Sequence, residues 1–383
     1  MRRMNNLITL FSAIFAFFFG SFLTTIVTNI EKCPSKTTVS KLEQNHDIFL
    51  MVLVLSAPNY IDKRQIIRDT WLKVARPLVQ PYYPEDFVYV PDYDEDGFLE
   101  MESVAEQSNR IRNYLDWLDG VENAVASRRF IKIKHYFAIG TQNLSPVLMG
   151  ELRKEQNEFN DMLFLLDVRD SYANLTKKLI SSLEHLTNHE SFTYLLKVDD
   201  DSYVKMDYLV NELVSFDRKL IRKSSEYKTN PIPELYWGFF NGRAAIKTRG
   251  QWKEEHYYIC SKYAPYALGG GYVISRSIAE YIDANSQILN TYVSEDISMG
   301  TWLAPLRNIY RRHDIRFDTG YMPRKCRRQH IVLHKRTIQQ MKDLYEGKLC
   351  TFEVPKENTL KRPLEYYYDW KKPAESCCNN IAV

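Results

Sequence analysis

Apolar residues in this 383-residue chain follow two patterns that alternate along its length. Continuous apolar runs such as Ile48–Leu55 are typical of strands buried on both faces of a sheet. Between these runs, leucines recur at spacings of three and four residues, which predicts amphipathic helices. Alternating strands and helices predict an α/β fold with a mostly parallel sheet and helices on both faces. The expected strands are Ile48–Leu55, Lys134–Ile139, Met162–Leu166 and Phe192–Val198, and the expected helices are Lys63–Trp71 and Tyr172–His189.

One apolar segment near the N-terminus has a different character. Leu7 to Ile30 holds no ionisable side chain and is long enough to cross about 30 Å of hydrocarbon. Arg2 and Arg3 precede it, which places the N-terminus in the cytoplasm and the rest of the chain on the other side. A cleaved signal peptide is the alternative, but its apolar core usually spans only about 7–15 residues. We therefore expect one membrane anchor and a type II topology.

These boundaries give the expected domain organisation. Residues 1–6 form a cytoplasmic tail, 7–30 a signal anchor, 31–46 a polar stem and 47–383 a lumenal domain. Within that domain, residues 74–129 turn acidic, irregular and rich in proline. We expect them to form a solvated surface insertion.

Features that matter only in the secretory pathway test the same topology. Asn174 and Asn143 begin N-glycosylation tripeptides, and Pro146 directly after the second tripeptide favours Asn174 as the modified residue. In an oxidising compartment, cysteines tend to pair, although buried free thiols are the alternative. The five cysteines after the stem, whose pairing the sequence leaves open, are Cys260, Cys326, Cys350, Cys377 and Cys378.

Composition narrows the class of protein. Hydrophobic residues make up 45% and aromatic residues 13% of the chain, which excludes a disordered protein. The formal net charge is only +3, so the sequence lacks the strong basic bias of nucleic-acid-binding proteins. We expect no nucleic-acid partner.

Three consecutive carboxylates follow directly on a predicted buried strand. Asp199, Asp200 and Asp201 come after Val198, and in α/β folds ligands bind beyond the carboxyl ends of the strands. Their mutual repulsion favours a bound cation, and carboxylate oxygens prefer hard ions such as Mg²⁺ and Mn²⁺. The glycine and glutamate that an EF-hand requires are absent. A divalent-metal site is the prediction, and a solvated turn is the alternative.

Three further positions are candidates for chemistry. Glu295 and Asp296 follow Ser294, so they fit a helix N-terminus as well as a catalytic pair. The Gly269–Gly271 run fits either a close approach of a sugar or diphosphate to the backbone or a plain turn. His334 ends a short apolar run and is a metal ligand only if the aspartates hold an ion.

Together these segments resemble a known family, the β-1,3-galactosyltransferases of glycosyltransferase family 31. The motifs that carry the resemblance are Arg64–Trp71, Lys197–Asp201, Tyr236–Gly238, Ala267–Val273 and Glu295-Asp296. A finer resemblance, to the members that build the glycosaminoglycan linker, rests on Tyr236–Arg243, Pro265–Gly271, Trp302–Pro305, Arg316–Thr319 and Tyr368–Trp370 before Cys377-Cys378. It covers about residues 48–74 and 131–378 and leaves the 74–129 insertion outside.

The resemblance implies a single GT-A, Rossmann-like domain that uses UDP-galactose and Mn²⁺. The implied acceptor is Gal-β1,4-Xyl on a proteoglycan core protein, or a xyloside that mimics it, and the implied location is the Golgi membrane. An α-linked donor would give a β-linked product by a single displacement with inversion.

The resemblance also assigns roles. Asp296 would be the base, with Glu295 positioning the substrate or tuning that base. Asp201, Asp199 and His334 would hold the metal. The residues expected to contact the donor are Arg64, Arg68, Asp199, Asp200, Trp237, Gly269 and Gly270.

Two alternatives remain open at this stage. One is an enzyme of the same fold with another donor or acceptor, such as a β-1,3-N-acetylglucosaminyltransferase. The other is a non-catalytic lectin, although a protein that only binds sugars has no use for a base.

Overall fold

The computed structural model describes residues 46–73, 79–121, 126–128, 131–228, 230–322, 326–348 and 365–381. The expected tail, anchor and nearly all of the stem lie outside these ranges. No helix within them has both the length and the apolar character needed to cross a bilayer. The anchor over residues 7–30 therefore stays a prediction. Residues His46–Val383 form one compact unit, which is described below.

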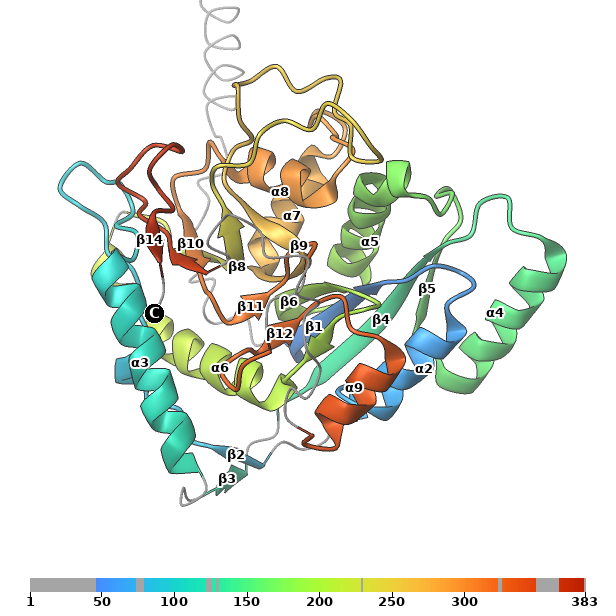
Figure 1. The fold of residues 1–383 in the computed structure, drawn as a ribbon, viewed down its shortest axis with the longest axis horizontal. Helices are drawn as coiled ribbons and strands as arrows, with labels where there is room; N and C mark the ends of the chain where they lie inside the picture. The colour runs from blue at the N-terminus through green and yellow to red at the C-terminus, as the bar shows by residue number, and fades with distance from the viewer. Residues whose placement is uncertain are drawn as a thin grey trace, which may run out of the picture. The chain divides into compact units, whose positions relative to one another are not determined.

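A mostly parallel central sheet organises this unit (Figure 1). Within the described residues it has seven strands in the order β10-β8-β9-β6-β1-β4-β5. The buried β1 pairs in parallel with both β4 and β6, as the apolar runs predicted. Only β9 runs against its neighbours β6 and β8. The strands are β1 (Ile48–Leu55), β4 (Ile133–Gly140), β5 (Met162–Leu165), β6 (Phe192–Asp199), β8 (Glu234–Asn241), β9 (Tyr266–Ser275) and β10 (Ile309–His313).

Helices pack beside the strands of the sheet. In Figure 1, α5, α7 and α8 pack together beside β9, and α2 lies next to α9. The observed α2 and α5 confirm the helices expected around Lys63–Trp71 and Tyr172–His189. The helices are α2 (Ile61–Asp69), α3 (Val104–Gly120), α4 (Pro146–Phe159), α5 (Leu175–His189), α6 (Met206–Lys223), α7 (Arg276–Asn285), α8 (Glu295–Leu303) and α9 (Ile338–Tyr345).

Short elements complete the unit. A second, three-stranded sheet has the order β11-β12-β7 and lies beside the end of β6. Because β12 pairs antiparallel with β7, it brings a C-terminal segment to the loop that follows β6. The remaining elements are β2 (Val79–Pro81), β3 (Ala126–Arg128), β7 (Tyr203–Val204), β11 (Phe317–Asp318), β12 (Val332–Leu333), β13 (Tyr366–Tyr367), β14 (Asn380–Ile381), and the 3₁₀ turns η3 (Glu85–Phe87), η5 (Tyr172–Asn174) and η6 (Ser224–Tyr227).

The segment expected to be an irregular, solvated insertion is helical and partly buried over Val104–Gly120. It contains α3, which begins at a capping box formed by Ser103 and Glu106. Arg110 on this helix is buried and donates hydrogen bonds to Glu102 and to Asp314. The helix buries Ile111, Tyr114 and Leu118 together with this paired arginine, and the acidic, proline-rich composition of the whole segment did not predict it.

The cysteines support the expected pairing in part. Cys326 is disulfide-bonded, and Cys377 and Cys378 are bonded to each other. Cys260 is exposed and free. None of the described cysteines is therefore a buried free thiol.

Candidate functional site

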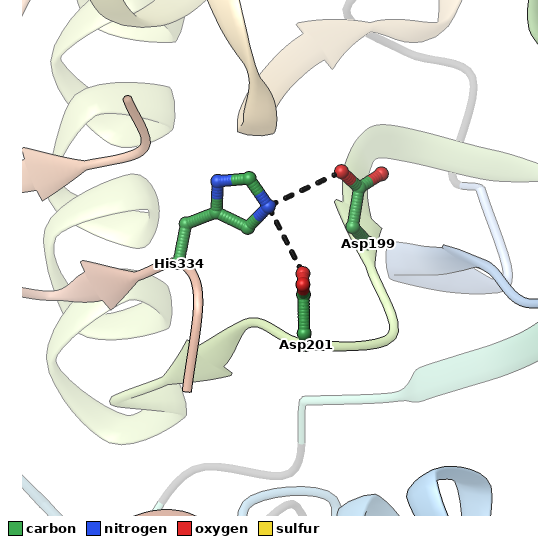
Figure 2. Close-up of side chains that lie close together, drawn as sticks. All are labelled: Asp199, Asp201 and His334. Atoms are coloured by element: carbon green, nitrogen blue, oxygen red, sulfur yellow. Dashed lines mark ion pairs between the residues drawn. The ribbon is translucent and has the colours of Figure 1, made fainter. Parts of the chain in front are cut away.

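The site forms where β6 ends. Asp199 is the last residue of β6, Asp201 lies in the turn that follows, and His334 comes directly after β12. The backbone N–H of Arg336 donates to the carbonyl oxygen of Asp201 at 2.8 Å, which ties the two segments together. Figure 2 shows both carboxylates facing the His334 imidazole.

Asp199, Asp201 and His334 form a compact group of potential metal ligands. Their nearest ligand atoms all lie within 4.8 Å of one another. His334 Nε2 lies 2.9 Å from Asp201 Oδ1 and 3.4 Å from Asp199 Oδ2 (Figure 2). His334 Nδ1 lies 3.2 Å from the Gly320 carbonyl oxygen, a contact that orients the ring and leaves Nε2 toward the carboxylates.

The donor set fits a divalent cation. Within the described structure, His334 Nε2 and Asp201 Oδ1 are buried atoms that lack a well-oriented hydrogen bond, although they form a close ion pair. Buried polar atoms are rarely left in this state. A cation bonded to both would satisfy them, and carboxylates and imidazole are both ligands of divalent metal ions.

The charges in this cluster respond to one another. Burial lowers the pKa of His334, but the carboxylates of Asp199 and Asp201 outweigh it and raise that pKa to about 9. Burial raises the pKa of Asp199, but the Lys197 ammonium and His334 hold it below its usual range. Without a cation, the imidazole therefore carries the positive charge that the two aspartates require.

Asp200 points away from this cluster. Its carboxylate accepts a hydrogen bond from Lys63 Nζ at 2.8 Å and lies 3.4 Å from the backbone nitrogen of Ala57. It therefore joins the loop after β6 to the loop after β1 and to α2. Of the three aspartates, Asp199 and Asp201 belong to the group of potential metal ligands, and contact of Asp200 with the donor stays a prediction.

Glu295 and Asp296 are the first two residues of α8, which packs against β9. The predicted helix start is confirmed, although the Ser294 side chain makes no capping hydrogen bond. Asp296 Oδ2 accepts from the backbone N–H of Gly269 and Oδ1 from that of Ile297, each at 2.9 Å. These two bonds fix the carboxylate and leave each oxygen one further lone pair.

Lys197 connects the two halves of the site. It lies two residues before the end of β6 and is 1% exposed. Its Nζ donates to Asp199 Oδ1 at 3.0 Å, to the Gly269 carbonyl oxygen at 2.6 Å and to Glu295 Oε1. Tyr272 donates to the other oxygen of Glu295 at 3.0 Å. One ammonium therefore contacts a candidate metal ligand and the neighbour of the candidate base.

This arrangement sets the protonation of the two acids. Burial raises the pKa of Glu295 to about 7, against the opposing charge of Lys197. Burial likewise raises the pKa of Asp296, again opposed by Lys197 and by the Gly269 N–H. A carboxylate whose pKa is raised accepts protons more readily while still ionising near neutral pH.

The glycine run has a steric purpose, and the plain-turn alternative is wrong because the run lies inside β9. A Cβ on Gly270 would lie 2.5 Å from the His334 ring and 2.7 Å from the Thr319 carbonyl oxygen. A Cβ on Gly269 would lie 3.1 Å from Glu295 Oε1 and 3.2 Å from Asp296 Oδ2. The missing side chains let the metal cluster and the acid pair approach the same strand.

Three other residues expected to contact the donor have partners within the fold. Arg64 is buried, and its guanidinium is committed to Glu155 and to oxygens of residues 56–58, so it shapes the loop after β1. Arg68 pairs with Glu155 and Asp161. Trp237 is fully buried and donates to Asp314. These contacts support the fold, and contact of the three residues with the donor stays a prediction.

The two N-glycosylation tripeptides differ in exposure. Asn143 is exposed, with a left-handed φ of 63°, and it precedes the N-terminus of α4. Asn174 is half-buried, and its side chain donates to the Arg169 carbonyl oxygen. The hydroxyl of Thr176, which completes its tripeptide, is buried and donates to the Tyr292 carbonyl oxygen. Modification of either asparagine stays a prediction.

Sequence reasoning assigned no role to Lys197 or Tyr272. A signal for Lys197 was available, because a lysine inside an otherwise apolar buried strand requires a partner. No comparable signal marked Tyr272, whose partner Glu295 lies in a different element.

Comparison with known proteins gives consistent matches. A family model described as galactosyltransferase matches residues 109–313, beginning within α3. Mouse beta-1,3-galactosyltransferase 6 is 34% identical over 335 residues, which cover 86% of this chain and 82% of the mouse protein. Human UDP-GalNAc:beta-1,3-N-acetylgalactosaminyltransferase 2 is 34% identical over 155 residues, 40% of this chain and 28% of that protein. Hydroxyproline O-galactosyltransferase GALT5 of Arabidopsis thaliana is 26% identical over 308 residues, covering 79% of this chain and 40% of the plant protein.

Proposed function

Because the chain belongs to the galactosyltransferase family, we propose that it transfers galactose from UDP-galactose to Gal-β1,4-Xyl on proteoglycan core proteins, forming a β-1,3 bond. The product would extend the linker that carries heparan and chondroitin sulfate. The family match and the extent of similarity to the mouse β-1,3-galactosyltransferase support the reaction. The acceptor rests on the finer motif resemblance in the sequence.

One observation carries the proposal. A cation-binding cluster and an anchored carboxylate lie at one sheet edge, joined through Lys197. A sugar-nucleotide transferase needs both features, because one stabilises the departing diphosphate and the other accepts the proton of the incoming hydroxyl.

Asp199, Asp201 and His334 would hold Mn²⁺. When bound, the ion would supply positive charge to the diphosphate of the donor, which is worth several kcal/mol of transition-state stabilisation. The half-buried position of both aspartates leaves the cluster open to such a ligand.

Asp296 would act as the base. The 3-hydroxyl oxygen of the acceptor attacks the anomeric carbon as the bond from that carbon to the diphosphate breaks, and UDP leaves with the electron pair. The hydroxyl proton passes to Asp296, whose two backbone hydrogen bonds hold the carboxylate in place. Attack opposite the leaving group converts an α-linked donor into a β-linked product.

Lys197 and Glu295 would position these groups. Their contact fixes the start of α8 relative to the end of β6, and therefore Asp296 relative to the metal cluster. A positioned reactant pair avoids much of the entropic cost of a bimolecular step. Neither residue needs to touch the reacting atoms to do this.

One rival reaction has specific support. The human relative is named as an enzyme that uses UDP-GalNAc, and its match supports transfer of an N-acetylhexosamine as the second candidate. It spans only 40% of this chain, whereas the mouse galactosyltransferase match spans 86%. A lectin role has less support because the base and the cation cluster are both present.

We also propose a Golgi membrane location, with the catalytic unit in the lumen. The charge asymmetry around residues 7–30 and the two N-glycosylation tripeptides support it. Digestion of intact Golgi vesicles with protease should spare residues 46–383, and cleavage there without detergent would contradict the topology.

The test of the reaction uses the purified full-length protein with Mn²⁺ and a β-galactosyl-1,4-xyloside. UDP-galactose, UDP-GlcNAc and UDP-GalNAc are offered separately, and the product linkage is determined by NMR. We expect transfer from UDP-galactose and a β-1,3 linkage. Transfer of only an N-acetylhexosamine, or an α-linked product, would overturn the proposal.

A further inference from the structure

One aromatic pair belongs neither to the group of potential metal ligands nor to the acid pair Glu295 and Asp296. Trp252 lies in the long connection between β8 and β9, and Tyr321 follows β11. Their rings meet edge to face, with centroids 5.0 Å apart and planes at 82°. Tyr321 is 65% exposed and Trp252 is partly exposed. Tyr and Trp side chains offer an apolar ring together with a polar group, and for that reason they are enriched at binding interfaces.

Tyr321 lies next to the metal cluster. The preceding residue, Gly320, places its carbonyl oxygen 3.2 Å from His334 Nδ1. A Cβ on Gly320 would contact Leu268 at 3.7 Å, and Leu268 precedes the glycine whose N–H binds Asp296. The residue before Tyr321 therefore lies beside both His334 and β9, the strand whose backbone binds Asp296.

Trp252 is tied to the acid pair from the opposite direction. Glu254, two residues further along, is buried and accepts from the backbone N–H of Val293 at 2.9 Å. Val293 lies two residues before Glu295, so this bond fixes the Trp252 loop to the start of α8. A cluster of Tyr257, Tyr263, Tyr266, Tyr292 and Ile297 packs beneath the loop and supports it.

We propose that Trp252 and Tyr321 form the platform that binds the pyranose ring of the acceptor sugar. This inference rests on the proposed transferase function. A pyranose has apolar C–H faces that pack on aromatic rings and hydroxyl groups at its rim. Residues beside the platform contact His334 and the segment just before α8, so a ring packed there would lie next to the proposed site. The donor is instead bound through its diphosphate at the cation cluster, which assigns the platform to the acceptor.

The test compares Trp252→Ala and Tyr321→Ala with the wild type in transfer kinetics. We expect the KM for the galactosyl xyloside to rise about tenfold or more, with the KM for UDP-galactose within twofold of wild type. Trp252→Phe should restore much of the acceptor affinity. Tyr258→Ala is the matched control, because Tyr258 lies on the same connection and is 78% exposed but is outside the pair. An unchanged acceptor KM, or a rise confined to the donor KM, would overturn the platform.

A binding measurement separates this inference from the proposed reaction. Saturation-transfer NMR with UDP, Mn²⁺ and the same xyloside detects the acceptor without turnover. A signal in the wild type that Trp252→Ala abolishes supports the platform even if no transfer occurs, in which case the proposed reaction fails alone. A signal that survives both alanine variants, or no signal in the wild type, overturns the platform, while transfer by the wild type still supports the reaction. Thermal unfolding of each variant identifies any loss due to misfolding.

Discussion

Replacing Asp296 with asparagine removes the proposed base with almost no change in shape. A positioned general base typically contributes about 10²–10⁴-fold, so we expect kcat to fall by that factor, equivalent to about 3–5 kcal/mol in activation free energy. The binding of UDP and Mn²⁺ should persist, because Asp296 lies outside the Asp199, Asp201 and His334 group.

The structure also predicts a cost in stability for Asp296→Asn. Both carboxylate oxygens accept backbone N–H groups, from Gly269 and from Ile297. Asparagine offers one oxygen and one NH₂ group, so one backbone N–H loses its acceptor and faces a donor. We expect a loss of about 1–3 kcal/mol in the free energy of unfolding.

The assay follows galactose transfer at saturating donor and acceptor, with thermal unfolding and UDP affinity measured on the same preparations. Asp283→Asn is the matched control, because Asp283 accepts hydrogen bonds from Thr187 on α5, outside the proposed site. Turnover within threefold of wild type for a folded Asp296→Asn protein would refute the base assignment. Loss of UDP affinity equal to the loss of turnover would instead show that the residue acts in binding.

Three further perturbations test the framework around the base. Lys197→Met leaves the carboxylates of Glu295 and Asp199 without the ammonium group that they share. We therefore expect the free energy of unfolding, measured by chemical denaturation, to fall by about 3–5 kcal/mol. A fall below about 1 kcal/mol would contradict this network. The pKa of Glu295 is raised by burial to about 7, and the unfolded chain releases this proton near 4.5, so the folded protein binds more protons between these values. In EDTA, the unfolding free energy of wild type minus that of Glu295→Gln should therefore fall as pH rises from about 4.5 to 7, and a flat difference would contradict the raised pKa. Gly270→Ala should displace His334 and so raise the Mn²⁺ concentration needed for activity. Gly150→Ala is the control, because a Cβ on Gly150 meets no other atom, and it should leave that concentration unchanged. Equal Mn²⁺ requirements for the two variants would contradict the steric role of Gly270.

Apolar patterning predicted the strands around the site closely. The run Ile48–Leu55 matches β1, and the strand expected to end at Val198 ends one residue later. Such runs are informative because a strand buried on both faces consists almost entirely of apolar side chains. The position of the three aspartates at the end of this strand predicted a cation site, and Asp199 and Asp201 lie together there with His334.

Long-range pairing limited the remaining predictions. The role of His334 depends on β12 pairing with β7, more than one hundred residues earlier in the chain, and local sequence gives no register for that pairing. Arg64 and Arg68 form part of a motif, but whether an arginine faces a ligand or a buried glutamate depends on α4, which supplies Glu155. The prediction for residues 74–129 missed α3 for a related reason, because Arg110 on this helix is buried against Asp314, which lies far later in the chain.

Asp199, Asp201 and His334 are proposed to bind the divalent cation that the donor requires. This binding is tested most directly by titrating the full-length protein with Mn²⁺ in the presence of UDP and following free Mn²⁺ by electron paramagnetic resonance. We predict one tightly bound ion per chain in the wild type and in Asp296→Asn, and its loss in Asp201→Ala. Binding in Asp201→Ala with wild-type affinity and stoichiometry would contradict the account.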